Sequence, residues 1–118
     1  MLSEPQLVGS VRAALDGQGS VREQRMFGGI GFMLNGNLMA GASKRGLLLR
    51  VGKEQRGKAL KLSGTRPLIM RGRELADYVY ADAPIGARTL QALLRLAIPH
   101  VRSLPLKVAG RKAARAKK

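Results

Sequence analysis

The chain has 118 residues, with 22 Lys plus Arg against 7 Asp plus Glu, so its net charge is +15, and it contains no cysteine. This length predicts one domain with a core of its own, and the missing cysteines exclude disulfides, thiolate catalysis and most structural zinc sites. No apolar run approaches the roughly 20 residues that span a bilayer, and no secretion signal opens the chain, so we expect a cytoplasmic protein without membrane contact.

The first half of the chain predicts one helix followed by antiparallel strands. Apolar residues recur at three- and four-residue steps over residues 4–16, which predicts an amphipathic helix. Residues 20–27 alternate in polarity, with Val21 facing inward, and this pattern indicates a strand. A turn at residues 44–46 leads into a further apolar strand over residues 47–51.

The clearest local pattern is a hairpin over residues 29–42. Asn35-Gly36 joins two apolar segments there, and this dipeptide supplies the positive φ angles of a type I′ turn. A two-residue loop sets the register, so two cross-strand pairs are expected: Phe32 with Met39, and Met33 with Leu38. The face with the larger side chains should be the core, which leaves Ala40 on the outer face.

The second half predicts five elements: a short helix within residues 53–62, a loop over 63–67, strands over 68–70 and 76–81, and a long helix over 89–103. Pro99 removes one backbone donor and should kink the long helix or end its regular part. The complete order is helix, four strands, helix, two strands, helix. It predicts an α+β two-layer sandwich, in which an antiparallel sheet of about five to six strands carries its helices mainly on one face.

The positive charge is concentrated toward the C-terminus. Residues 1–43 hold three basic and three acidic groups, whereas residues 83–118 hold nine basic groups and no acid. Six of those cations fall within residues 107–118 among small side chains, which cannot bury enough surface to offset the entropy of ordering. We therefore predict a folded domain over residues 1–106 and a disordered basic tail over residues 107–118.

Nucleic acid is one partner that this charge predicts. Three arginines of the last helix are seven residues apart and so align on its solvent side. Together with the tail they form the predicted set of non-specific phosphate contacts: Arg88, Arg95, Arg102, Lys107, Arg111, Lys112, Arg115, Lys117 and Lys118. The alternative is a protein-binding module, in which a sheet edge or the hairpin face docks a transcription-related protein and charge only steers association. In either case we expect a monomer or a weak homodimer.

The residues that could carry chemistry are few and scattered. His100 is the only histidine, and Asp77 and Asp82, five residues apart, would face opposite sides of a strand, which is wrong for a carboxylate pair or a shared metal. Tyr78 and Tyr80 share one face, and they are either rim residues of the core or a small stacking platform for bases. We expect no enzymatic activity, no cofactor and no metal.

Four segments, in this order along the chain, carry a resemblance to a known family: residues 22–39, with Met-Phe-Gly-Gly at positions 26 to 29, and residues 46–52, 64–67 and 70–73. Together they resemble the N-terminal domain of the TfoX/Sxy family over residues 10–105. The resemblance implies an α+β domain without established enzymatic activity or cofactor, from bacterial regulators of natural competence that assist transcription. A basic tail stands where full-length members carry a second, helical domain, so we expect a stand-alone, non-enzymatic regulatory or adaptor module.

Overall fold

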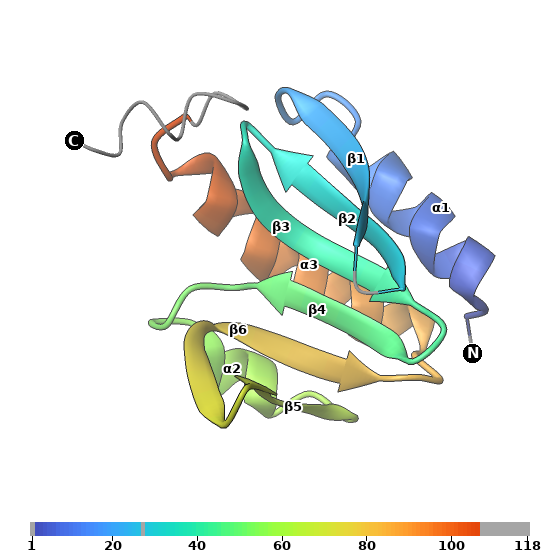
Figure 1. Ribbon diagram of the computed structural model, residues 1–118, viewed down its shortest axis with the longest axis vertical. Helices are drawn as coiled ribbons and strands as arrows, with labels where there is room; N and C mark the ends of the chain where they lie inside the picture. Colours follow the sequence, from blue (N-terminus) through green and yellow to red (C-terminus); the bar gives the residue numbers. More distant parts are fainter. Residues whose placement is uncertain (1, 27, 107–118) are drawn as a thin grey trace.

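The computed structural model describes residues 2–26 and 28–106 and shows a six-stranded antiparallel sheet with three helices on one face (Figure 1). The helices are α1 (Glu4–Leu15), α2 (Arg56–Leu60) and α3 (Ala87–Arg102). The strands are β1 (Val21–Met26), β2 (Gly29–Leu34), β3 (Asn37–Ser43), β4 (Gly46–Arg50), β5 (Thr65–Met70) and β6 (Arg73–Asp82). This chain order confirms the predicted element order and the α+β two-layer architecture. Within the sheet the strands lie in the order β1-β2-β3-β4-β6-β5.

The core lies between the helices and the face of the sheet that they cover, here called the covered face. The sheet contributes fully buried side chains at Phe32, Leu34, Leu47, Leu49 and Val79. The helices contribute Leu7, Val11 and Leu15 from α1, Ala59 from α2, and Leu90, Leu93, Leu94, Ala97 and Val101 from α3. In the described part of the chain no helix is long and apolar enough to cross a membrane.

Local sequence explains where α1 begins, and α3 runs past its internal proline. α1 opens with a capping box, because the Gln6 backbone N–H donates to Ser3 Oγ and the Ser3 backbone N–H donates to Gln6 Oε1. Pro5 lies in the first turn, where its missing N–H removes no helical hydrogen bond. α3 continues past Pro99 to Arg102, so Pro99 does not end this helix; its ring lies at an exposed position.

Two tight turns have positive φ angles at both central residues, and the first of them was predicted. Asn35 and Gly36 have φ angles of 52° and 82°, as a type I′ turn requires, and Met33 lies opposite Leu38 as predicted. Arg71-Gly72, between β5 and β6, repeats the same backbone with φ angles of 53° and 76°. In both turns a glycine takes the second central position, where a positive φ angle has no steric cost.

A β-bulge makes the predicted register of the first hairpin wrong beyond its first pairs. The pairing shifts between Phe32 and Met33, so that Phe32 lies opposite Ala40 and not opposite Met39. Met39 and Ala40 are both fully buried, which also contradicts the prediction that Ala40 lies on the outer face. The extra residue of a bulge turns successive side chains to the same side, and a strict two-residue period cannot predict this.

Two further predictions are wrong at the edge strands β5 and β1. The predicted loop over residues 63–67 is wrong at its end, because β5 begins at Thr65 and Pro67 pairs with Val79. Proline is tolerated there because β5 borders only β6, so its missing N–H removes no second ladder. Val21, predicted to face inward, is 38% exposed because β1 is the opposite edge of the sheet.

Candidate functional site

The outer side of α3 presents a row of arginines, here called the α3 arginine row: Arg88, Arg95 and Arg102. All three are exposed, on the side opposite the buried leucines of the helix. At 1.5 Å per residue, successive members are separated by about 10 Å along the helix axis. Arg102 Nη1 donates to Gln18 Oε1 at 3.1 Å. Within residues 2–26 and 28–106, none of the three forms an ion pair.

The remaining six residues of the predicted phosphate-binding set lie outside the described residues: Lys107, Arg111, Lys112, Arg115, Lys117 and Lys118. The predicted tail over residues 107–118 lies outside them as well. The structure therefore brings together three of the nine predicted contacts. It places them on a helix that carries no acidic residue.

The acids of β6 are already bound by arginines of neighbouring elements. Glu74, Asp77 and Asp82 pair with Arg56 of α2, Arg50 of β4 and Arg66 of β5, respectively. The Asp77 carboxylate also accepts the Lys53 backbone N–H at 3.1 Å. Because each carboxylate neutralises a different arginine, Asp77 and Asp82 do not come together as a catalytic pair.

Tyr78 and Tyr80 lie on the face of the sheet away from the helices, here called the open face. Tyr80 is opposite Leu48 and Tyr78 is opposite Arg50, so the two rings share a face as predicted, whereas Val79 points to the covered face. The Arg66 guanidinium lies 4.8 Å from the Tyr80 ring centre, and that of Arg50 lies 5.7 Å from the Tyr78 ring centre. Burial raises the pKa of Tyr78 above its ordinary value. Both rings therefore belong to a partly buried, cation-covered surface.

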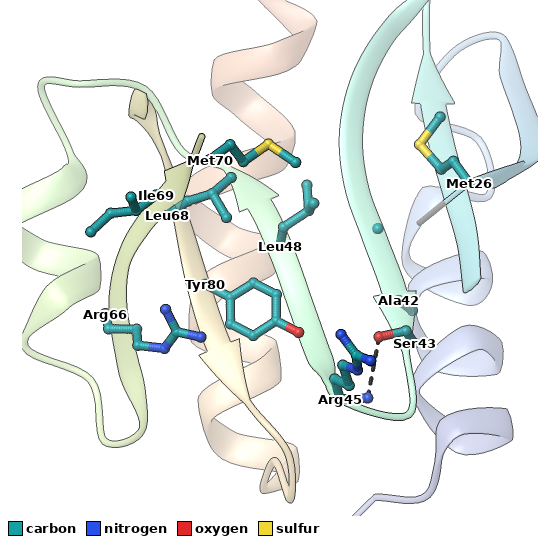
Figure 2. Close-up of a pocket in the computed structure, with 11 residues that line it drawn as sticks. Met26, Ala42, Ser43, Arg45, Leu48, Arg66, Leu68, Ile69, Met70 and Tyr80 are labelled. Atoms are coloured by element: carbon teal, nitrogen blue, oxygen red, sulfur yellow. Dashed lines mark hydrogen bonds between the residues drawn. The ribbon is translucent and has the colours of Figure 1, made fainter. Parts of the chain in front are cut away.

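The open face is hollowed into a groove of about 240 Å³ (Figure 2). Its larger apolar lining residues come from β1, β4, β5 and β6: Met26, Leu48, Leu68, Ile69, Met70 and Tyr80. In Figure 2, Leu48 and Tyr80 lie in the centre, while Leu68 and Met70 extend toward them from β5. Arg45 lies at one end, in the turn between β3 and β4, and its backbone N–H donates to Ser43 Oγ at 3.2 Å.

The sequence predictions did not include this groove, although one signal for it was present. Leu47, Leu48 and Leu49 follow one another in β4, and a strand with three consecutive leucines is expected to have apolar surroundings on both faces. Leu48 is 6% exposed, whereas Leu47 and Leu49 are fully buried on the covered face. The run therefore marks a strand whose second face is apolar without being covered by a helix.

The lone histidine lies beside a second cavity, of about 450 Å³, at the end of α3. His100 packs so closely on Gly52 that a Cβ there would lie 2.6 Å from His100 Nδ1. His100 Nε2 is buried and has no hydrogen-bond partner among the described residues. The Asp77 carboxylate also lines the cavity, but it accepts its hydrogen bonds from the Arg50 side chain and the Lys53 backbone N–H. It therefore does not orient the imidazole. Across residues 2–26 and 28–106, no group of three metal-binding side chains is present.

Comparison with known proteins gives one match. A family model described as the TfoX N-terminal domain matches residues 13–100, which include everything from the last turn of α1 to near the end of α3. Neither the curated proteins nor the solved structures include a match to this chain. The matched span contains the whole sheet, the groove and two of the three members of the α3 arginine row.

Proposed function

The chain belongs to the TfoX N-terminal domain family, and from this premise we propose that it is a regulatory module that acts by binding, with nucleic acid contacted through the α3 arginine row. The role in competence and transcription that the family implies is in keeping with such a module. The cations of residues 107–118 add further phosphate contacts. The proposal assigns no catalytic step to the chain.

The observation that carries this proposal is the exposed α3 arginine row on a helix without acids. Of the other arginines, Arg12, Arg50, Arg56 and Arg66 are neutralised by carboxylates. Others, such as Arg45 and Arg73, are also unpaired within the described residues, but they are not aligned on one helix. Guanidinium groups that lack such partners are available to bind phosphates. Contacts to phosphates do not depend on the base sequence, so this binding is non-specific. Binding of this kind releases counterions, so its affinity falls steeply as salt rises.

The salt dependence of binding to duplex DNA tests the proposal. We expect the slope of log K against log salt to flatten by about 3 when Arg88, Arg95 and Arg102 are all replaced by Gln, because each lost phosphate contact removes about 0.9. A chain ending at Leu106 should flatten it by about 5, for six lost cations. Fluorescence anisotropy over about 50 to 200 mM salt measures both slopes.

A matched control removes the same charge from another surface. Lys53, Lys58 and Lys61 are exposed around α2, and their replacement by Gln also lowers the net charge by three. This control should leave the slope nearly unchanged. Equal flattening by the two triple variants would mean that DNA responds to overall charge, and the α3 arginine row would lose its assigned role.

A further inference from the structure

The floor of the groove is aliphatic and thioether in character, and it is shaped by two glycines. Gly31 and Gly41 face each other across β2 and β3, on the open face. Met26 lies over the first, where a Cβ would be 2.5 Å from its sulfur, and Leu48 lies over the second, where a Cβ would be 3.2 Å from its Cγ. Flexible methionine and leucine side chains over bare backbone form a surface that adapts to apolar side chains.

The groove fits side chains of a polypeptide better than bases or a small ligand. Its volume of about 240 Å³ is below the roughly 300–1,000 Å³ of small-molecule pockets. Bases bind by stacking on exposed aromatic rings, but Arg66 and Arg50 already lie over the rings of Tyr80 and Tyr78. The remaining contact surface is that of leucine and methionine.

The charge around the groove is positive and open to a partner. Asp82 of β6 is paired with Arg66, which lines the groove. Arg45 at one end, and Arg73, which lies opposite Met70 in the β5–β6 hairpin, form no ion pair within the described residues. A second copy of the chain would bring the same cations face to face, which disfavours self-association through this surface.

We infer that the groove is a docking site for an acidic amphipathic segment of a protein partner. The apolar side chains of that segment lie over Met26, Leu48 and Met70, and its carboxylates pair with Arg45 and Arg73. A groove that combines the buried Leu48 with the half-buried Met26 and Met70, and that is bordered by unpaired cations, is the complement of such a segment. The groove is on the open face, whereas α3, which carries the arginine row, lies on the other side of the sheet (Figure 1), so the inference does not depend on DNA binding.

Selection from a displayed random-peptide library tests the inference on the full chain, with excess duplex DNA present to occupy the α3 arginine row. We expect selected sequences to combine Asp and Glu with Leu, Ile, Phe and Met. A fluorescein-labelled selected peptide should then bind at least about tenfold more weakly to R45E and to M70E, as expected for a lost charge-assisted contact and a lost apolar contact.

Two variants control for charge and for added polarity outside the groove. Lys44 is the exposed neighbour of Arg45, and Val21 is an exposed apolar residue on the edge strand β1; neither lines the groove. K44E and V21E should keep the affinity within about twofold. The triple Gln variant of the α3 arginine row should also bind the peptide normally, which separates this inference from the proposed function. Thermal melting followed by circular dichroism verifies that each variant is folded. If M70E is unfolded, the peptide affinity of R45E decides the test.

Four results would overturn the inference. The selection could yield peptides without acidic enrichment, or K44E could weaken binding as much as R45E. A single-stranded oligonucleotide could displace the peptide and lose affinity in R45E and M70E, which would assign the groove to nucleic acid. Sedimentation could show a dimer that M70E dissociates, which would assign it to a second copy of the chain.

Discussion

The covered face and the open face of the sheet are made by the same six strands, but their chemistry differs. On the covered face, Leu47, Leu49 and Val79 are completely buried against the helices. On the open face, the neighbouring positions of the same strands hold Leu48, Tyr80 and glycine, with arginines above them. The covered face therefore contributes most of the buried apolar surface that stabilises the fold, whereas the open face combines fewer buried apolar side chains with cations.

Truncating matched leucines of β4 should show this difference most strongly. Leu49→Ala should lower the free energy of unfolding by about 3–4 kcal/mol, because it loses buried apolar surface and leaves a cavity that the helices cannot fill. Leu48→Ala should cost about 1–2 kcal/mol, because water in the adjoining groove can occupy the space and only the transfer contribution is lost. Urea denaturation of both variants measures the two costs. Equal costs would mean that the open face is part of the folding core.

The glycines of β2 give a smaller contrast. At Gly29 an added Cβ would overlap the Ala42 carbonyl oxygen, and a backbone atom in a paired strand cannot move away. Gly29→Ala should therefore destabilise the protein by about 2–3 kcal/mol through overpacking. At Gly31 the three atoms nearest to an added Cβ all belong to the flexible Met26 side chain, so Gly31→Ala should cost less than about 1 kcal/mol. Thermal unfolding compares the pair, and a costly Gly31→Ala would show that Met26 is fixed in place.

The parts of the fold that sequence predicts well are those with a strong local pattern. α1, the Asn35-Gly36 turn and α3 each carry periodicity or turn residues that act over a few neighbouring positions. The bulge at Met39 and the strand character of Pro67 depend on partners far along the chain, so local periodicity cannot predict them. Tertiary pairing decides these positions.

The two candidate surfaces also differ in how far local sequence predicts them. A seven-residue spacing within one helix was sufficient to align Arg88, Arg95 and Arg102 on one exposed side. The groove instead joins β1, β3, β4, β5 and β6 around Leu48, and its existence depends on the strand order and on which face the helices cover. Sequence alone indicated only that Tyr78 and Tyr80 share a face.

The smallest predicted effect concerns the ionisation of Tyr78 on the open face. Burial raises its pKa in the folded protein, with the nearby Arg50 cation opposing that shift, so folding favours the protonated phenol. The resulting contribution to stability is complete below the unfolded pKa of about 10 and is lost as pH rises through the higher folded value. Alkaline titration of tyrosinate absorbance in the wild type and in Tyr78→Phe measures the shift. The wild type should lose stability above pH 10 more steeply than the variant. Because a fully hydrated phenol would titrate at its ordinary value, identical profiles would show that water reaches this part of the open face as freely as it reaches the surface.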